Sequence, residues 1–356
     1  MPRIRTVALV AGVALLTRRA LRRRIETSPL WPLPALEEPV SGRPRSRALR
    51  LTVARHERVA DGVVQLRLEG RDLPKWEPGA HLDVVLPSGL VRQYSLCGDP
   101  EDSSSYTVAT RLIGAEQGGR GGSREVHERL GEGVEVEVRG PRNRFPLADA
   151  PSYAFVAGGI GITPILPMLR AVEASGADWR LLYGGRSRGS MPFLEEIEKL
   201  GGAGRQRVTV VAEDEAGLPD PAAFLAGTPR GTAVHVCGPE ALMDAVEAAL
   251  PEGCTLHLER FSPRTCLDGN APFEVELRRS GRTVAVAADT TVLAAVRAEL
   301  PDTPYSCEQG FCGTCQQRVV EGEIDHRDEL LDDGERAASM LLCVSRARGE
   351  RLVLDM

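Results

Sequence analysis

The stretch Cys307-Glu-Gln-Gly-Phe-Cys312-Gly-Thr-Cys315, with Cys343 further on, decides the fold of the C-terminal part of this chain. Its spacing, Cys-x4-Cys-x2-Cys and a distant fourth cysteine, is that of a plant-type [2Fe–2S] site. Two irons bridged by two sulfides need four thiolates, and the two glycines of the loop let it wrap closely around them. The alternative is structural zinc, but a zinc ribbon usually has two Cys-x2-Cys pairs. We therefore predict that Cys307, Cys312, Cys315 and Cys343 ligate a [2Fe–2S] cluster.

The cysteines lie in a small α+β unit that spans residues 273–356. Phe273–Leu277 and Thr283–Val286 flank Ser280-Gly281, which predicts a β-hairpin. Val292–Glu299 is predicted to be a helix. The unit contains 16 Asp or Glu against 10 Arg and no Lys. This acidic charge suits docking to a basic partner surface, and it suits plain solubility equally well.

Residues 47–150 show short apolar runs with a period of two, punctuated by Gly, Pro, Asp and Ser. This period is typical of strands, and several strands at short spacing predict an antiparallel barrel. The predicted strands are Leu49–Val53, Val63–Leu68, His81–Leu86, Tyr106–Leu112 and Val134–Val138.

Residues 151–262 change to strands that alternate with helices, which predicts a parallel α/β sheet. The predicted strands are Tyr153–Ala157, Trp179–Gly184, Val208–Ala212 and Ala233–Cys237, and the predicted helices are Pro164–Ala174, Phe193–Leu200 and Pro239–Leu250. Residues 263–272 contain Pro263, Gly269 and Pro272 and are predicted to be a hinge.

Two motifs on the predicted barrel point to a phosphorylated ring ligand. The strand end Arg92-Gln-Tyr94-Ser95 offers a cation, a ring face and a hydroxyl close together. The run Gly118-Gly-Arg-Gly-Gly-Ser123 precedes a short predicted helix, whose N–H groups can bind a phosphate. Each alone is weak, since an ordinary strand end and a surface loop look similar. Together on one barrel they predict a flavin site.

Two further motifs predict a nicotinamide dinucleotide site on the α/β sheet. Gly158-Gly-Ile-Gly-Ile-Thr-Pro164 joins a buried strand to a helix, and its glycines would let the backbone approach a pyrophosphate. Cys237-Gly-Pro239 ends a later strand at the carboxyl edge of the sheet, where ligands bind in such folds. Cys237 could equally be a buried small apolar residue. Arg186 and Arg188 end another strand and could meet a ribose or a 2′-phosphate.

The first 46 residues lie outside these domains. Val7–Leu16 is an apolar run of ten residues between arginines, whereas a membrane-spanning helix needs about 20. No cleavage site of a secretion signal follows it. Residues 1–24 could hold the chain weakly on an anionic membrane face, or they could be an extension without function. Trp31–Ser46 is rich in Pro and charge and is predicted to be a linker.

Charge and cysteine usage bound the remaining possibilities. The net charge of −6 argues against nucleic acid as a partner. Four cysteines at metal-ligand spacing indicate reduced thiols and a cytoplasmic protein, with the inner membrane face as a secondary location. His326-Arg-Asp328 spells the catalytic triplet of a protein kinase, but the other kinase motifs are missing, and we interpret it as surface. We expect His127 and His257 to be structural.

Taken in order from about residue 49 to the end, these motifs resemble the phthalate dioxygenase reductase and vanillate demethylase reductase family. The resemblance implies a flavin-binding β-barrel first, an NAD-binding α/β domain second and a β-grasp ferredoxin domain last. It also implies FMN rather than FAD and NADH as the electron donor, with NADPH as an alternative because of the second arginine at 188.

The resemblance carries residue roles onto the matching positions. Those implied to bind FMN are Arg92, Gln93, Tyr94, Ser95, Ala109, Thr110, Arg111, Gly121, Gly122, Ser123, Thr163 and Phe261. Those implied to line the nicotinamide cofactor are Gly158, Gly159, Gly161, Arg186, Gly238 and Pro239. Cys237 and Ser95 are expected at the reacting centre as catalytic residues.

The implied function is that of a reductase component of an oxygenase system. Electrons would pass from the nicotinamide through the flavin to the cluster and then to a partner oxygenase, either a Rieske-type aromatic-ring dioxygenase or demethylase or a haem monooxygenase. The alternatives are a non-catalytic iron–sulfur sensor and a membrane-associated redox partner of another enzyme. The oxygenase substrate is not encoded in these motifs.

Overall fold

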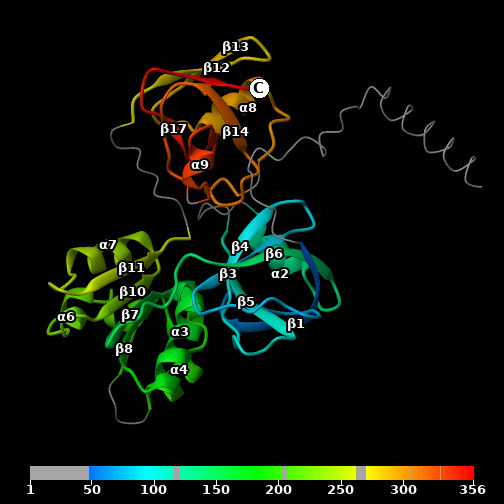
Figure 1. The fold of residues 1–356 in the computed structure, drawn as a ribbon. Helices are drawn as coiled ribbons and strands as arrows, with labels where there is room; N and C mark the ends of the chain where they lie inside the picture. The colour runs from blue at the N-terminus through cyan, green and yellow to red at the C-terminus, as the bar shows by residue number, and fades with distance from the viewer. Residues whose placement is uncertain (1–47, 115–120, 203–206, 262–269, 306, 329) are drawn as a thin grey trace, which may run out of the picture.

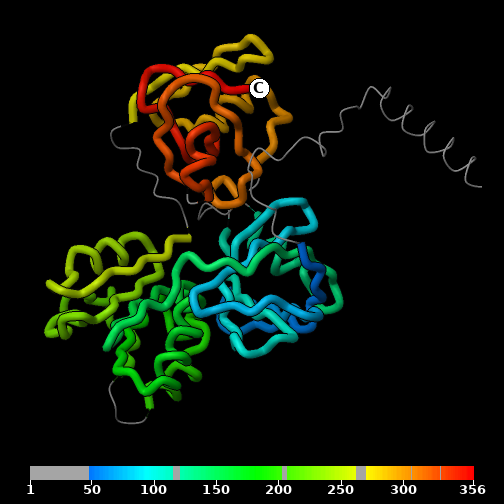
Figure 2. Tube along the Cα trace, viewed as in Figure 1, coloured from blue at the N-terminus to red at the C-terminus, as the bar shows by residue number. Residues whose placement is uncertain are grey.

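The structure is a computed structural model that describes residues 48–114, 121–202, 207–261, 270–305, 307–328 and 330–356. Three sheet-containing domains follow one another along the chain, and the third lies over the other two (Figure 1). The trace of the chain shows the same three lobes (Figure 2). The predicted fold class is confirmed. Residues 1–46 and most of the predicted hinge lie outside the described residues.

The first domain is a six-stranded antiparallel sheet with the order β4-β3-β6-β1-β2-β5. The sheet closes into a barrel because Leu96, directly after β4, bridges Val108 of β5, and the Cys97 N–H donates to the Thr107 carbonyl at 2.9 Å. Its strands are β1 (Leu49–Ala60), β2 (Val63–Glu69), β3 (Ala80–Val85), β4 (Val91–Ser95), β5 (Ser105–Arg111) and β6 (Glu135–Asn143).

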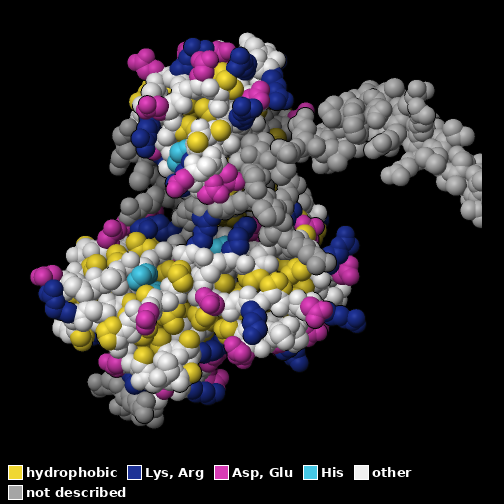
Figure 3. Space-filling view, viewed as in Figure 1, with side chains coloured by type: hydrophobic (Ala, Val, Ile, Leu, Met, Phe, Trp, Pro, Cys, Tyr) yellow, Lys and Arg dark blue, Asp and Glu magenta, His cyan; other side chains and the backbone are white. Residues whose placement is uncertain are grey.

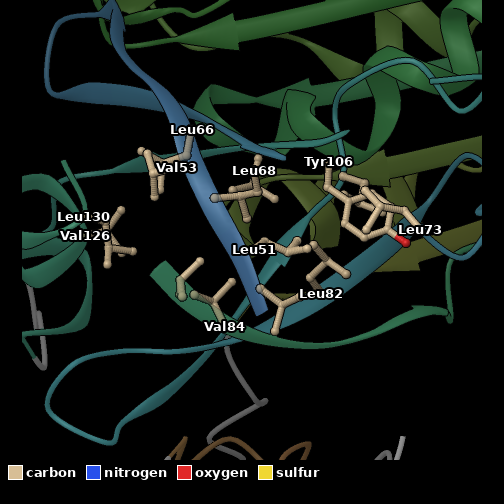
Figure 4. Packing of buried hydrophobic residues seen from close by; sticks show 14 of the residues in the cluster. Leu51, Val53, Leu66, Leu68, Leu73, Leu82, Val84, Tyr106, Val126 and Leu130 are labelled. Atoms are coloured by element: carbon tan, nitrogen blue, oxygen red, sulfur yellow. The ribbon is translucent and has the colours of Figure 1, made fainter. Parts of the chain in front are cut away.

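The alternating apolar residues of these strands fill the barrel, as the period of two predicts. Figure 4 shows Leu51, Leu68 and Leu82 pointing toward one another from different strands. Helix α2 (Gly122–Arg129) adds Val126, and Leu130 follows it into the same core. Each such side chain contributes about 1.5–3 kcal/mol through burial, so this core holds the flavin-type motifs on a rigid support.

The second domain is a parallel sheet with the order β11-β10-β7-β8-β9. Strand order reverses at β7, whose neighbours are β10 and β8, and ligands bind at such reversals in open α/β sheets. Apolar clusters cover both faces: α3 and α4 pack on one, and α6 and α7 on the other. The elements are β7 (Ser152–Gly158), α3 (Ile162–Ser175), β8 (Asp178–Gly185), α4 (Leu194–Gly201), β9 (Val208–Ala212), α5 (Glu213–Ala216), α6 (Pro221–Leu225), β10 (Ala233–Cys237), α7 (Glu240–Ala248) and β11 (Thr255–Glu259), with η3 (Gly159–Gly161) and η4 (Arg188–Ser190) as short 3₁₀ turns.

The third domain is a mixed sheet with the order β13-β12-β18-β14-β16. The predicted hairpin is confirmed, and β18 pairs with β12 in parallel. Helix α8 (Val292–Glu299) has the predicted bounds and begins at Thr291, whose hydroxyl accepts a hydrogen bond from the Ala294 N–H at 3.1 Å. The other elements are β12 (Phe273–Leu277), β13 (Arg282–Val286), β14 (Gln316–Glu321), β15 (Ile324–Asp325), α9 (Asp333–Arg336), β16 (Ser339–Leu341), β17 (Arg346–Ala347) and β18 (Arg351–Leu354).

Specific contacts join the barrel to the parallel sheet. The Arg170 guanidinium on α3 donates to the carbonyls of Cys97 and Gly98 at 2.8 and 2.7 Å. Arg111 at the end of β5 donates to the Ser190 carbonyl at 2.5 Å. A small apolar cluster that includes Ala109 from the barrel and packs against partly buried Ile160 lies at the same junction. These contacts fix the carboxyl edge of the sheet against the barrel.

One sequence-based interpretation is wrong. The Asp328 side chain is fully buried, whereas we interpreted the triplet His326-Arg-Asp328 as surface. The Asp328 carboxylate accepts hydrogen bonds from the Leu330 and Leu331 N–H groups at 3.1 and 2.8 Å. These backbone bonds, together with the Arg336 guanidinium 3.8 Å from the carboxylate, offset the cost of burying the charge. Among the described residues, no helix is long and apolar enough to cross a membrane.

Candidate cofactor sites

The four cysteines converge in the third domain, from the loop before β14 and from the segment after β16. Cys307, Cys315 and Cys343 are buried and Cys312 is half-buried, and none forms a disulfide. Hydrogen bonds from the Cys312 and Cys343 thiols lower the pKa of the Cys307 thiol, so its sulfur favours the thiolate form. The same contacts raise the pKa of Cys312 and of Cys343, because each holds its proton toward Cys307.

The backbone of the loop turns toward these sulfurs. Gly310 and Gly313 have φ angles of 81° and 75°, a region that glycine adopts without strain. The Gln309 N–H points at the Cys307 sulfur at 3.3 Å and the Thr314 N–H at the Cys312 sulfur at 3.5 Å. Such N–H···S contacts stabilise clustered thiolates.

The donor set fits a [2Fe–2S] cluster. Four cysteine sulfurs would supply the two thiolates that each iron requires, and the inward N–H groups would donate hydrogen bonds to those sulfurs. Among the described residues, no three or more His, Cys, Asp or Glu side chains lie so that they could hold one metal ion, and a [2Fe–2S] cluster requires only two thiolates on each iron. Asp328 packs against the cysteine loop at Gly310. A Cβ on Gly310 would lie only 3.3 Å from the Asp328 Cα.

On the barrel, the two predicted flavin motifs meet in space. The Arg92 side chain on β4 crosses directly over Gly122 at the start of α2, so closely that a Cβ on Gly122 would lie 2.4 Å from the Arg92 Nε. Gly121, before the helix, has a φ of 80°. A guanidinium beside the free N–H groups of a helix start fits a phosphate group.

The remaining predicted FMN residues surround this point or line the junction. The Tyr94 hydroxyl is hydrogen bonded to Thr110, and burial raises the pKa of Tyr94 to about 12. The Ser123 hydroxyl accepts from the Ile113 N–H at 3.0 Å, and the buried Thr163 hydroxyl donates to the Ile160 carbonyl at 2.9 Å. Gln93 lies on β4 between Arg92 and Tyr94.

At the reversal of the parallel sheet, the two predicted nucleotide motifs pack against each other. A Cβ on Gly158 would lie 2.4 Å from Pro239, and a Cβ on Gly161 would lie 2.2 Å from the Cys237 carbonyl oxygen. Gly238 would likewise meet the Gly158 backbone at 2.9 Å. Only glycine permits this approach of two turns, and it leaves a backbone-lined edge for a dinucleotide. Gly159, with a φ of 54°, completes the first turn.

Cys237 is fully buried, and burial raises the pKa of its thiol, with Glu259 contributing further. Its thiol therefore stays protonated. Glu259 lies opposite Cys237 on the neighbouring strand, and its carboxylate accepts a hydrogen bond from the Ser95 hydroxyl at 3.3 Å. Ser95 and Cys237, predicted together at the reacting centre, are thus linked through Glu259.

Other predicted residues lie at the edges of this site. The Arg186 side chain is exposed at the end of β8. Arg188 forms ion pairs with Glu215 at 3.2 Å and Glu198 at 3.8 Å. Phe261 is 42% exposed, and its carbonyl accepts a hydrogen bond from the Gln309 side chain at 2.8 Å. The cysteine loop therefore contacts the chain beside the parallel sheet.

Comparison with known proteins agrees with this arrangement. Residues 155–248 match the family model described as "Oxidoreductase NAD-binding domain", and residues 275–348 match that of the "2Fe-2S iron-sulfur cluster binding domain". Phthalate dioxygenase reductase of Burkholderia cepacia is 38% identical over 321 residues, which cover 86% of this chain and 97% of that protein. The chain belongs to the phthalate dioxygenase reductase family.

Two further similarities extend this assignment. Phenoxybenzoate dioxygenase subunit beta of Ectopseudomonas oleovorans is 40% identical, covering 83% of this chain and 94% of that protein. The crystal structure of an intact type IV self-sufficient cytochrome P450 monooxygenase is 41% identical with a TM-score of 0.66. That match covers 93% of this chain and 44% of the longer protein.

The protein is therefore an NAD-dependent flavin and iron–sulfur oxidoreductase, the reductase component of an oxygenase system. Its cofactors are FMN, a [2Fe–2S] cluster and the nicotinamide dinucleotide. When bound, the flavin converts the two-electron hydride of the nicotinamide into the single electrons that the cluster carries.

Sequence reasoning missed several residues at the junction of the three domains. Glu259 ends a strand and carries no motif, and only the pairing of β10 with β11 brings it opposite Cys237. No sequence motif assigned a role to His81, Asp83 or Arg142. The first two were only placed in a predicted strand, and Arg142 follows another one. A buried charge inside an otherwise apolar strand, as at Asp83, is the one signal that could have marked them.

Proposed function

We propose that this reductase passes electrons from NADH to a separate terminal oxygenase protein, and that the acidic third domain is its docking surface for that partner. The observation that carries the proposal is the meeting of the three sites at one junction. Ser95 of the barrel contacts Glu259 of the parallel sheet, and Gln309 of the cysteine loop contacts the Phe261 carbonyl. This arrangement supports electron transfer along the order nicotinamide, flavin, cluster.

The predicted residue roles and domain boundaries belong to this proposal. The barrel would occupy residues 47–150, the nucleotide domain 151–262, the hinge 263–272 and the ferredoxin domain 273–356. Arg92, Gly121 and Gly122 would hold the FMN phosphate, because they place a cation and free N–H groups together. Ser95 and Cys237 would border the reacting atoms.

The partner that we favour is a Rieske-type aromatic-ring dioxygenase or demethylase. Two relatives that this chain matches over more than nine tenths of their length are named for phthalate dioxygenase and phenoxybenzoate dioxygenase. A haem monooxygenase is the second candidate, because the self-sufficient cytochrome P450 monooxygenase matches 93% of this chain.

The decisive test is anaerobic titration of the purified protein with NADH and with NADPH, followed by absorbance. We expect flavin and iron–sulfur bands that bleach with NADH, and NADH-dependent reduction of cytochrome c. NADH is expected to act at much lower concentration, since Arg188 is already engaged by Glu215 and Glu198. Equal bleaching by NADPH would contradict the donor preference, and colourless protein would contradict the whole scheme.

Location is a further part of the proposal. We infer a cytoplasmic protein, with residues 1–24 as a weak contact to the inner membrane face. These residues lie outside the described part of the chain. Fractionation of the full-length protein beside a version that lacks residues 1–46 tests this contact. Equal recovery of both versions in the supernatant at low salt would contradict it.

A further inference from the structure

Strand β3 carries two polar side chains, His81 and Asp83, on the face that points away from the barrel core. Leu82 and Val84 alternate with them and pack inside the barrel. Both outward residues are nevertheless buried, with His81 2% and Asp83 3% exposed. An outward face of a barrel is normally solvated, so another part of the molecule must cover this one.

The neighbours of these residues identify the place. On one side His81 lies opposite Ser95, whose hydroxyl contacts Glu259. On the other side His81 lies opposite Arg142 of β6, and the Arg142 guanidinium donates to the Asp83 carboxylate. The face is therefore continuous with the flavin strand and with the edge of the nucleotide domain.

The cysteine loop reaches the junction beside this face, because Ser95 next to His81 contacts Glu259, and Gln309 of the loop contacts the nearby Phe261. Burial is the largest cause that raises the pKa of the Asp83 carboxyl, and Arg142 acts in the opposite direction. A charge on the Cys307 sulfur raises the same pKa further, so this sulfur lies near Asp83. Gln309, two residues after Cys307, is anchored to the Phe261 carbonyl at 2.8 Å. Figure 3 shows arginine or lysine and histidine side chains gathered in the hollow below the C-terminal lobe.

Burial raises the pKa of Asp83, so a charge on this carboxyl is held at a cost. Its Oδ1 and both ring nitrogens of His81 have no hydrogen-bond partner among the described residues. The nearby cations are Arg142 and Arg139 beside Asp83, and Arg142 and Arg144 beside His81. An incompletely satisfied buried charge is expensive to keep, and such charges concentrate where function requires them.

Reduction of the cluster site adds one electron, and hence one negative charge, while no bond breaks and no proton moves. A nearby carboxylate opposes that added charge, and a nearby guanidinium favours it. Water is largely excluded at this face, so both effects are stronger than on a solvated surface.

We propose that Asp83 and Arg142 are a charge pair beside the cysteine loop, and that they set the reduction potential of the cluster through their opposite charges. This inference rests on the assigned [2Fe–2S] cluster and goes beyond the proposed partner and donor. Asp83 and Arg142 touch no reacting atom and act through the cysteine loop.

The test is a potentiometric titration of Asp83→Asn and Arg142→Gln in the full-length protein, with the reduced cluster followed by electron paramagnetic resonance at pH 8. In Asp83→Asn the ratio of reduced to oxidised cluster at a fixed potential should rise roughly tenfold, ~59 mV for a one-electron couple. In Arg142→Gln the ratio should fall by a similar factor. The opposite signs are decisive, since a purely structural disturbance would not follow charge.

The matched control is Asp102→Asn, which removes a carboxylate that pairs with Arg67 at 3.4 Å elsewhere on the same barrel. It should leave the potential unchanged. If Asp83→Asn loses its cofactors, Arg142→Gln alone decides, because it must lower the ratio. Unchanged potentials, or shifts of the same sign, in variants that retain the cluster spectrum would overturn the inference. A wild-type protein without that spectrum would instead overturn the assigned cluster.

Discussion

At the scale of single residues, the sulfur contacts make each cysteine of the site essential. Replacing Cys343 with Ser removes one thiolate and leaves an iron without its ligand set. We expect Cys343→Ser to lose the [2Fe–2S] absorbance and at least 100-fold of its cytochrome c reduction, while FMN content is retained because the barrel has its own core. Ferricyanide can accept electrons directly from the flavin. Its reduction therefore measures electron transfer from the nicotinamide to the flavin in the variant.

The matched control for that experiment is Cys254→Ser. Cys254 is partly exposed and lies in the nucleotide domain at the turn before β11. Its replacement should change neither absorbance nor cytochrome c reduction. Retention of the cluster in Cys343→Ser would contradict the assigned ligands.

Gly122 tests the FMN phosphate site at the same scale. A methyl group there would lie 2.4 Å from the Arg92 Nε, so the guanidinium would have to move away from the helix start. We expect Gly122→Ala to bind FMN at least tenfold more weakly, measured by fluorescence of the released flavin. Gly131→Ala, where nothing lies within 4 Å, should bind FMN normally. Equal FMN affinity in the two variants would show that the phosphate lies elsewhere.

At the scale of elements, the nucleotide site is made by two turns rather than by side chains. The turn after β7 and the turn after β10 touch at glycines, and Gly161 faces the Cys237 carbonyl. A Cβ at Gly161 would push the two turns apart. We expect Gly161→Ala to raise the KM for NADH at least tenfold in steady-state assays.

Chemical reduction by dithionite provides the control for Gly161→Ala, because it needs no nucleotide site. Dithionite should reduce the flavin and the cluster of the variant as in the wild type. A normal KM for NADH in Gly161→Ala would contradict the role of this turn contact in nucleotide binding.

A buried histidine on β10 makes the stability of the nucleotide domain depend on pH. The His235 ring stacks on His257 at 4.6 Å, and its Nε2 accepts a hydrogen bond from the Ala148 N–H at 3.3 Å. Burial, and then His257, lowers the pKa of His235 to about 4 from an ordinary 6.5. The unfolded chain therefore binds a proton between pH 6.5 and 4 that the folded domain excludes, and stability falls as pH falls through this window.

We expect His235 to contribute about 2 kcal/mol of stability loss between pH 7 and pH 5. Urea unfolding at the two pH values measures it. In His235→Gln, which does not titrate, the difference between the two pH values should shrink by that amount. An unchanged pH dependence would mean that the ring binds a proton as readily in the folded domain as in the unfolded chain.

At the scale of the whole molecule, transfer depends on how the barrel is held against the nucleotide domain. Arg170 spans that junction with two bonds to barrel carbonyls and an ion pair with Glu196 at 2.6 Å. Replacing Arg170 with Met would leave both carbonyls without their donor. We expect flavin reduction by NADH to slow at least tenfold in stopped-flow experiments, with both cofactors still bound.

The control for this prediction is Arg230→Met in the same domain. Arg230 pairs with Glu252 at 3.0 Å on an exposed surface, where ion pairs contribute little. It should reduce its flavin at the wild-type rate. A normal rate of flavin reduction in Arg170→Met would mean that Arg170 does not determine how the barrel is held against the nucleotide domain.

The sequence by itself determined the elements and the ligand-bearing motifs. Period-two runs predicted the barrel strands, and cysteine spacing predicted the cluster site, because both depend on residues that are close along the chain. The bounds of α8 and the hairpin of β12 and β13 were predictable for the same reason.

Only the tertiary structure decided what meets at the three-domain junction. Glu259 faces Ser95 across 164 positions of sequence, and Asp83 is buried although it lies on the outward face of its strand. Burial and charge pairing depend on contacts between residues remote in sequence, and local periodicity contains no information about those contacts.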